Sequence, residues 1–419
     1  MKHGILSLAG ASLLAIGLQG GAAAAQDCTV NVGTLYPTSV DWGRPIAETA
    51  LWVGEMINEA GGIDGCAVNM ILRDDQSDAR VGVDAARALV DIDQVQLLIG
   101  TVSSGITIPI LTSVTAPSGV MQMSCCSSSS RLTDIAASGE SRGLWFRTFA
   151  TADVQAAVAA MLARDAGIDS ITVVYKNDDW GQDIGALSAA AFEGVGINVI
   201  DQIAINDAQP SYRAEATQAL QGQPGALYLA LYPTEGISFV REWIGLGGTN
   251  TMVAANSLKS DDFRTSVGLD NLGAFVGTDT SSPRVQSATD FIDAYTAHFG
   301  SAPSGPGLAN SFDAAAIALL AYHAAGRDAS GEAIAAEVPR ITDPDGEAVP
   351  ATVEGFTRAM EILSGGGSVS YQGATGAVTF DANGDVSAPA VSWGFDAQGI
   401  TEKSYISLEE VSAFMASIN

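Results

Sequence analysis

Two serine-rich segments are the places where this sequence could most readily bind a polar group. Residues 100–105 (Gly-Thr-Val-Ser-Ser-Gly) follow an expected buried strand over 95–99, and residues 124–130, with four consecutive serines, follow another over 119–123. Hydroxyl groups and free backbone N–H groups at the start of a helix bind carboxylate or carbonyl oxygens. Ligands bind beyond the carboxyl ends of the strands in open parallel sheets. We therefore predict that these two segments, which include Ser103, Ser104 and the serines from Ser127 to Ser130, form a polar ligand site.

Both segments also have a simpler interpretation. Ser103 or Ser104 could cap the helix that follows without contacting a ligand, and the serine run could be a low-complexity loop. The position of the two segments after successive strands favours the ligand site.

Two tryptophans stand at equivalent places in the two halves of the chain. Trp42 precedes Gly43 just before the first expected helix, and Trp180 precedes Gly181 just before the matching helix of the second half. Tryptophan is more often a core residue, but in a strand-end loop it can contact an apolar part of a solute. We predict this role for Trp42 and Trp180, and core packing inside helices for Trp52 and Trp243.

The sequence lacks the motifs that common catalytic and cofactor sites require. No G-x-S-x-G, P-loop or G-x-G-x-x-G follows an expected strand. Histidine occurs only at positions 3, 298 and 323, and no His/Cys spacing is typical of a metal site. We expect a binding protein that is not an enzyme and needs no cofactor or metal. A secreted hydrolase with an unrecognised site is the less favoured alternative.

Strands and helices alternate along the chain, and the alternation restarts after Arg147. Such alternation predicts a parallel sheet covered by helices on both faces. Two successive series predict an α/β fold with two doubly wound, Rossmann-like lobes. The expected strands cover residues 29–36, 67–73, 95–99 and 119–123 in the first series, and 171–175, 197–203, 226–231 and 251–254 in the second.

Three segments are expected to connect the lobes as a hinge. They are residues 144–148, residues 273–279, and the turn 381–385 between short strands at 376–380 and 390–395. Helices over 285–299 and 308–325 are expected to return to the first lobe. Lobe 1 is thus predicted to comprise residues 26–147 and 278–383, and lobe 2 residues 148–277 and 384–419.

The N-terminus has the features of a signal peptide. Lys2 precedes an apolar stretch from Ile5 to Leu18, and three alanines at 23–25 supply the small residues that signal peptidase reads. We expect residues 1–25 to be removed and the mature chain to be soluble in the periplasm; an uncleaved anchor is the alternative. The residues before Cys28 lack the pattern of a lipoprotein signal.

Net charge and cysteine usage narrow the partners and the compartment. The formal charge of −28 repels nucleic acid and anionic lipid, so we expect neither as a partner. In an oxidising compartment cysteines can pair. Cys28 and Cys66 open neighbouring expected strands and are the preferred disulfide. For Cys125 and Cys126 we favour two buried thiols over a vicinal disulfide.

Several segments, taken together and in order, resemble the leucine/isoleucine/valine-binding protein family of ABC importers. These segments are residues 57–65, 73–78, 99–105, 175–181, Tyr232-Pro233 and 312–315. The resemblance covers nearly all of the mature chain. It implies a type I periplasmic binding fold, in which two lobes joined by three segments close on a ligand.

The resemblance also implies roles for single residues. Ser103 and the segment 126–128 would hold a carboxylate or amide head, Trp42 and Trp180 would be aromatic contacts, and Tyr232 would contact the ligand from lobe 2. Amino-acid binders of the family carry an acid where this chain has Asn256, which weakens the case for an α-amino acid. Asp279 could supply the missing charge.

The resulting hypothesis is a periplasmic solute-binding protein. It is expected to be a monomer, to bind a small amino acid, amide, urea or (aromatic) carboxylate, and to deliver it to an ABC permease in the inner membrane. A ligand-sensing partner of a membrane receptor is the alternative that the sequence does not separate from it.

Overall fold

The computed structural model of the protein describes Met1, residues 28–206 and residues 209–418. Apart from Met1, the signal peptide predicted for residues 1–25 lies outside the described residues. Within the described part, no helix is both long enough and apolar enough to cross a membrane.

Lobe 1 is built on a five-stranded parallel sheet in the order β2-β1-β3-β4-β5. Its strands are β1 (Thr29–Tyr36), β2 (Ala67–Asp74), β3 (Leu97–Gly100), β4 (Met121–Ser124) and β5 (Trp145–Arg147). Its first helices are α1 (Arg44–Glu59), α2 (Ala79–Asp91), α3 (Ser104–Ile110), α4 (Ala116–Ser118) and α5 (Ser130–Ala137), with a π-helical turn over Leu111–Thr115. The apolar core on one face involves α1, and that on the other involves α2 and α3.

Lobe 2 is built on a seven-stranded sheet in the order β15-β14-β10-β9-β8-β6-β7. Its parallel strands are β6 (Ser170–Lys176), β7 (Asn198–Ile205), β8 (Ala226–Ala230), β9 (Thr251–Ala254) and β10 (Ala274–Thr280), while β14 (Ala390–Phe395) and β15 (Ile400–Ile406) are antiparallel. Its helices are α6 (Ala152–Asp165), α7 (Asp179–Gly194), α8 (Arg213–Gln221), α9 (Pro233–Gly245), α10 (Asp261–Val267) and α15 (Leu408–Ile418). The continuous apolar run of β8 is typical of a parallel strand buried on both faces.

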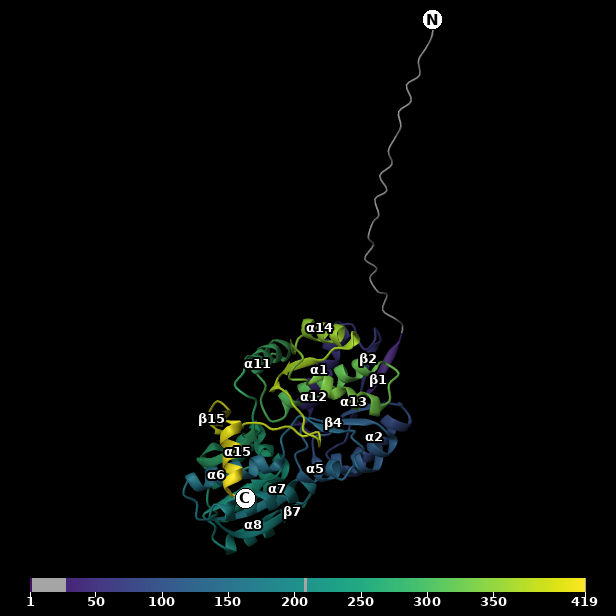
Figure 1. Ribbon diagram of the computed structural model, residues 1–419. Helices are drawn as coiled ribbons and strands as arrows, with labels where there is room; N and C mark the ends of the chain where they lie inside the picture. The colour runs from purple at the N-terminus through teal and green to yellow at the C-terminus, as the bar shows by residue number, and fades with distance from the viewer. Residues whose placement is uncertain (2–27, 207–208, 419) are drawn as a thin grey trace.

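Four later helices belong to lobe 1. They are α11 (Gln286–Phe299), α12 (Leu308–Ala325), α13 (Gly331–Ile341) and α14 (Val353–Ser364), and a small sheet of β11 (Glu347–Pro350), β12 (Val369–Gly373) and β13 (Gly376–Ala377) lies with them. Helix α12 is apolar on nearly all sides because it packs inside the lobe 1 core. Figure 1 shows α1, α12, α13 and α14 in one lobe, and α6, α7, α8 and α15 in the other.

The predicted architecture of two doubly wound α/β lobes is confirmed, with differences in detail. Trp145–Arg147, expected as connecting chain, forms strand β5. Residues 273–279, also expected as a crossing, form strand β10 inside the sheet of lobe 2, between β9 and β14. The expected strand over 376–380 is only the two residues of β13. The sequence prediction does not include α13 and α14, nor the short parallel strands β11 and β12 that alternate with them.

The chain passes between the two sheets after β5, after β10 and before β14, and backbone hydrogen bonds join these passages. Arg147 N–H donates to the carbonyl of Gly384 at 2.9 Å, and Ser281 N–H donates to that of Pro389 at 2.8 Å. Hydrogen bonds between the backbones of separate connecting segments restrict how these segments can move relative to one another. The arrangement therefore favours a defined hinge rather than a flexible linker.

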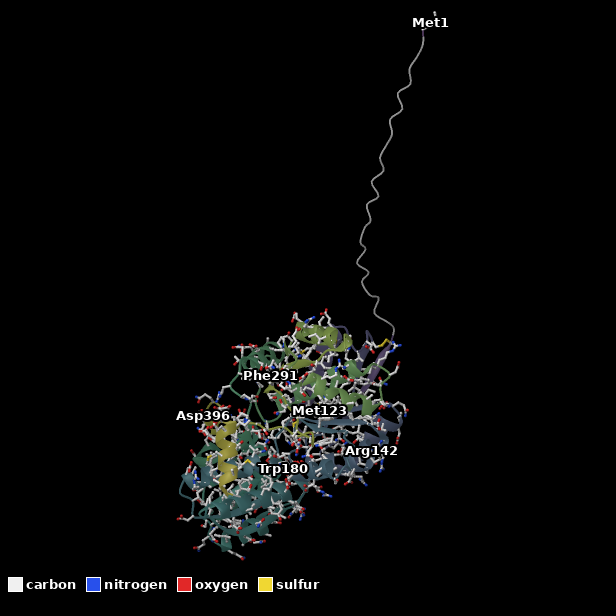
Figure 2. All side chains as sticks on the ribbon, in the orientation of Figure 1. Met1, Met123, Arg142, Trp180, Phe291 and Asp396 are labelled. Carbon is white, nitrogen blue, oxygen red and sulfur yellow. A yellow bond between two sulfur atoms is a disulfide. The ribbon has the colours of Figure 1, made fainter. Side chains whose placement is uncertain are left out.

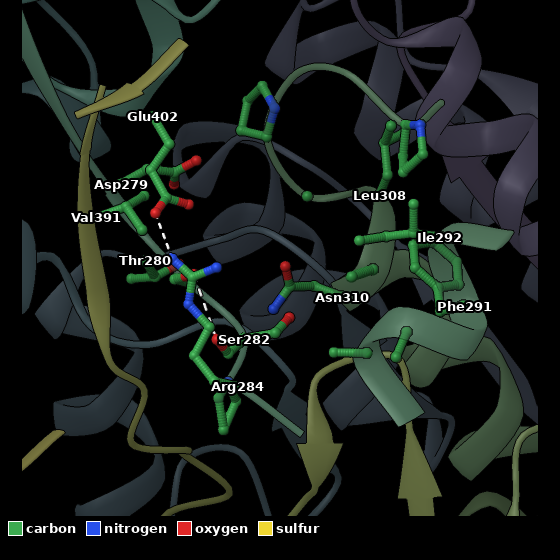
Figure 3. Close-up of a pocket in the computed structure, with 18 of the residues that line it drawn as sticks. Asp279, Thr280, Ser282, Arg284, Phe291, Ile292, Leu308, Asn310, Val391 and Glu402 are labelled. Carbon is green, nitrogen blue, oxygen red and sulfur yellow. Dashed lines mark hydrogen bonds and ion pairs between the residues drawn. The ribbon is translucent and has the colours of Figure 1, made fainter. Parts of the chain in front are cut away.

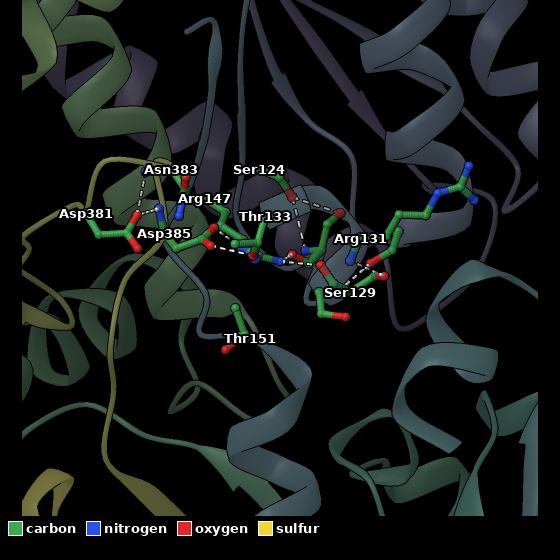
Figure 4. A network of polar contacts seen from close by, with 12 residues as sticks. Ser124, Ser129, Arg131, Thr133, Arg147, Thr151, Asp381, Asn383 and Asp385 are labelled. Carbon is green, nitrogen blue, oxygen red and sulfur yellow. Dashed lines mark hydrogen bonds and ion pairs between the residues drawn. The ribbon is translucent and has the colours of Figure 1, made fainter. Parts of the chain in front are cut away.

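A buried ion pair holds the first and third passages together (Figure 4). The Arg147 side chain is fully buried, and its Nε donates to Asp385 Oδ1 at 2.6 Å. Its Nη1 also donates to the carbonyls of Ser127 at 3.0 Å and Ser129 at 2.8 Å, and its Nη2 donates to Thr133 Oγ1 at 2.7 Å. One guanidinium thus fixes both the hinge and the serine loop.

Replacing Arg147 with Met should destabilise the whole fold, because Asp385 would remain buried without its cation. Breaking a buried pair in this way costs about 3–5 kcal/mol of unfolding free energy, measurable by urea denaturation. The matched control, Arg87→Met, changes an exposed arginine on α2 and should have little effect. A loss of stability equal to that of the control would contradict this role for the ion pair.

Candidate functional site

A small cavity lies between the carboxyl edges of the two sheets and is lined by both lobes. Its volume is about 60 Å³. Four aromatic side chains contribute to its walls: Trp42 from lobe 1, Phe149 from the first passage, and Trp180 and Tyr232 from lobe 2. The other lining residues are Ile46, Val102, Cys126, Ser128, Asn256, Ser257, Lys259, Ser260, Pro306 and Gly307. We call this the aromatic cavity.

Tyr232 is the residue through which the two lobes meet at this cavity. Its ring stacks with Trp42 at a centroid distance of 5.6 Å and with Trp180 at 5.1 Å. Its hydroxyl is 2.9 Å from Ser103 Oγ across the lobe boundary. Burial, together with nearby Asp178, raises the pKa of Tyr232, so the hydroxyl stays protonated and can donate to an oxygen.

The serine segments are brought together, but their side chains divide into two groups. Ser128 lines the aromatic cavity. Ser103 lies beside the cavity, where its hydroxyl is hydrogen-bonded to the hydroxyl of the lining residue Tyr232. Ser127 is buried, and its Oγ bonds Thr107 Oγ1 at 2.6 Å, while Ser104 Oγ accepts from Ser129 N–H at 3.1 Å. Ser104 and Ser127 therefore hold the loop in shape and do not line the cavity.

Ser103 occupies the N-cap position of α3, but its hydroxyl does not cap the helix. The capping interpretation of this side chain is therefore wrong, because the hydroxyl points to Tyr232 instead.

Trp180 differs from the prediction in its local structure. It was expected in a loop, but it lies in the first turn of α7 and is buried. Asp178 caps this helix by accepting the Gly181 N–H at 2.8 Å, so the helix starts earlier than its apolar pattern indicates. The indole still reaches the lobe boundary, where Figure 2 labels it.

All four cysteines are paired. Cys28 is bonded to Cys66, as predicted from the neighbouring starts of β1 and β2. Cys125 is bonded to Cys126, so the expectation of two buried thiols is wrong and the vicinal disulfide is the form present. Cys126 borders the aromatic cavity against Gly307, where an added Cβ would lie 2.6 Å from its Sγ. Only glycine fits at position 307 beside this sulfur.

The structure adds lining residues that the sequence did not single out. Lys259 is the one charged residue among those lining the aromatic cavity, and its Nζ is 2.9 Å from Asp279 Oδ2. Burial raises the pKa of Asp279, while Lys259 and Asn256 oppose that rise. Phe149, Pro306 and Gly307 come from connecting segments, whose positions depend on how the lobes pack.

A second and larger cavity, of about 590 Å³, lies beside the first (Figure 3). Arg284, Asn310 and Asp279 are among its lining residues, and Arg284 is ion-paired with Glu402. Phe149, Lys259, Pro306 and Gly307 line both cavities. Asp279 lines the larger cavity and not the aromatic cavity, whereas Lys259, its ion-pair partner, lines both.

Charged contacts join the lobes next to the aromatic cavity. Ser130, the first residue of α5 in lobe 1, donates its backbone N–H to Asp183 Oδ2 of α7 in lobe 2 at 2.8 Å. The Ser130 hydroxyl bonds the other oxygen of Asp183, and Arg131 pairs with Asp179. A carboxylate at the N-terminus of a helix is stabilised by the helix dipole. These contacts hold the lobes in the closed arrangement seen here.

Comparison with known proteins places these observations in a family. A family profile described as periplasmic binding protein matches residues 29–382. The chemotactic signal transduction system substrate-binding protein BasB of Halobacterium salinarum is 27% identical over 84% of this chain and 84% of its own length. The Leu/Ile/Val-binding protein BraC3 of Rhizobium johnstonii is 26% identical over 77% of this chain and 86% of its own. The matching family is one of binding proteins and is non-catalytic.

Solved structures of similar proteins share the fold. The leucine-binding protein LivK of Thermotoga maritima superposes with a TM-score of 0.74 at 19% identity, over 91% of this chain and 99% of that one. A solute-binding protein of an ABC transporter from R. palustris, solved in complex with benzoate, gives 0.69 at 15% identity, over 90% and 96%. At these identities the likeness shows the fold alone.

Replacing Asp183 with Asn should shift the ligand-free protein toward an open arrangement. Asparagine cannot accept both bonds from Ser130, and losing one charge-assisted bond costs about 1–3 kcal/mol. Small-angle X-ray scattering should show a larger radius of gyration for this variant than for the wild type. The control Asp169→Asn alters an exposed acid on lobe 2 and should leave the radius unchanged. An unchanged radius of gyration for Asp183→Asn would contradict the inferred role of Asp183 in holding the lobes together.

Replacing Asp75 with Asn should change how stability depends on pH. Asp75 follows β2 and is buried, and burial is the main cause that raises its pKa from 3.8 to about 7. The folded state therefore keeps a proton that the unfolded state releases, and stability falls as pH rises from about 4 through 7. The asparagine side chain keeps an oxygen for the Ser77 N–H bond but cannot ionise.

Urea denaturation at pH 4 and pH 8 tests this prediction. The variant should be more stable than the wild type at pH 8, and its advantage should shrink at pH 4. A difference that is the same at both pH values would show that Asp75 does not carry the shift.

Proposed function

This chain belongs to the periplasmic binding protein family, and we propose that it is the solute-binding component of an ABC importer. The proposed solute is a small amino acid, amide or (aromatic) carboxylate, held between the two lobes. The observation that carries the proposal is the aromatic cavity, whose walls come from both lobes and join through Tyr232.

The geometry supports binding by closure. Trp42 and Ser103 belong to lobe 1, whereas Trp180, Tyr232 and Asn256 belong to lobe 2. A solute in the cavity contacts both sets only when the lobes are together, so its binding favours the closed arrangement. We propose that Trp42, Ser103, Cys126, Ser128, Trp180, Tyr232 and Asn256 contact the solute, with Ser104 and Ser127 shaping the loop from behind.

We propose that the mature protein works as a monomer in the periplasm and delivers the solute to an inner-membrane permease. The predicted signal peptide and the two disulfides fit an oxidising compartment outside the cytoplasm. We place the lobe boundaries between residues 147 and 148, 277 and 278, and 383 and 384. The first and third boundaries lie where the chain passes between the sheets, whereas the second lies inside β10, before the passage that follows Thr280.

A sensory role is the second candidate, because one relative is named as a chemotactic substrate-binding protein. An importer component should stimulate the ATPase activity of its permease in liposomes when solute is present. A sensory protein should instead bind a membrane receptor and leave that ATPase at its basal rate. Permease and ATPase genes beside the coding gene would favour the importer.

A thermal-shift screen of amino acids, amides, aromatic acids and short carboxylates would identify a solute that binds. Replacing Trp42 or Trp180 with Ala should weaken that binding by about 2 kcal/mol, roughly 30-fold, because buried aromatic contacts dominate such sites. Isothermal titration calorimetry measures the change. Ile92→Ala, on an exposed part of lobe 1, is the control that should bind normally.

Unchanged affinity in both tryptophan variants would remove them from the site. A purified protein that binds none of the screened solutes, or that converts one into a product, would contradict the proposed function itself.

A further inference from the structure

The aromatic cavity has an unusual charge for a site that would accept an amino acid. Its described lining contains one charged residue, Lys259, and no acid. The nearest acid to this lysine, Asp279, is buried behind it and bonded to its Nζ at 2.9 Å. An α-ammonium group entering the cavity would therefore meet a cation and not a carboxylate.

Building on the proposed function, we infer that the Lys259–Asp279 pair sets the charge of the solute, so that the site accepts a carboxylate without an α-ammonium group. A lysine ammonium has three donor hydrogens. One of them serves Asp279, and the side chain remains about one-fifth exposed, so further donors can reach a solute carboxylate. Lys259 thus both attracts the anion and covers Asp279.

The neutral polar groups of the cavity fit the same class of solute. Asn256, Ser128 and Ser260 can donate to carboxylate oxygens without demanding a positive charge from the solute. The Ser257 hydroxyl already donates to the carbonyl of Leu231 at 2.7 Å. The four aromatic rings favour a planar or apolar body. The solute class is therefore an aromatic or short apolar monocarboxylate.

The Asp279 carboxylate is positioned so that it does not line the aromatic cavity. Its side chain is only 4% exposed, and it borders the larger cavity and not the aromatic one. Lys259 and the Asn256 side chain both act to stabilise its charged form. Removing Lys259 would leave a buried acid with Asn256 as its neighbouring polar side chain.

Two matched pairs of probes test the inference by calorimetry. The compounds 3-phenylpropanoate and L-phenylalanine differ only in the α-ammonium group, as do 4-methylpentanoate and L-leucine. The wild type should bind the deaminated member of at least one pair at least tenfold more tightly than its amino acid. Equal affinity within both pairs, tighter binding of the amino acids, or no binding of any probe would overturn the inference.

Substitutions at the pair test its cause. The Lys259→Met variant should bind the carboxylate at least tenfold more weakly than the wild type does. Its preference for the carboxylate over the matching amino acid should also be smaller than that of the wild type. Lys403→Met makes the same change of net charge on the exposed side of β15 and should behave as the wild type. Asp279→Asn should keep the preference, because Lys259 remains.

The double variant Lys259→Met/Asp279→Asn controls for a folding defect in the single variant Lys259→Met. It removes both members of the ion pair and therefore leaves neither charge buried without its partner. It should fold and lose the carboxylate preference, and a folded double variant that keeps this preference would overturn the inference. The proposed function would fail separately, if a broad screen found no solute at all.

Discussion

The hydrogen bonds and ion pair of the buried Arg147 guanidinium are the interactions on which the shape of the aromatic cavity depends. A charge without solvent must be satisfied by the protein, and here it is satisfied by Asp385 and by the carbonyls of Ser127 and Ser129. The same group therefore fixes the hinge and sets the serine loop against it. Ser128, between those two carbonyls, consequently faces the aromatic cavity. The shape of the site therefore depends on how the hinge segments pack.

The closed arrangement combines weak contacts of several kinds. Stacking of Tyr232 with Trp42 and the Ser103–Tyr232 hydrogen bond each contribute on the scale of about 1 kcal/mol, and each Asp183 bond to α5 contributes about 1–3 kcal/mol. Such a sum is small enough for a solute to shift, which is the condition for binding by closure. The charge at the cavity differs in sign from the charge of the whole chain. The chain has a formal net charge of −28, whereas the one charged residue that lines the aromatic cavity is a lysine.

Much of this could be predicted from sequence because it follows from short-range patterns. The strand over 29–36 and the helix over 308–325 have the predicted bounds, and the Cys28–Cys66 pairing followed from adjacent strand starts. Phe149 could not be predicted, because it enters the cavity through packing between distant segments. Lys259 was missed although it lies in the same segment after β9 as Asn256, because a lysine there has no pattern that separates a lining residue from an exposed one. The thiol prediction for Cys125 failed because no local pattern distinguishes two buried thiols from a vicinal disulfide.

A crystal structure of the protein with its best-binding carboxylate would test the central claim most directly. We expect the carboxylate group at Lys259 and Ser128, and the body of the solute against Trp42, Trp180 and Tyr232, with both lobes in contact with it. A solute bound in the larger cavity beside Arg284, or on the outer surface of one lobe, would contradict the account.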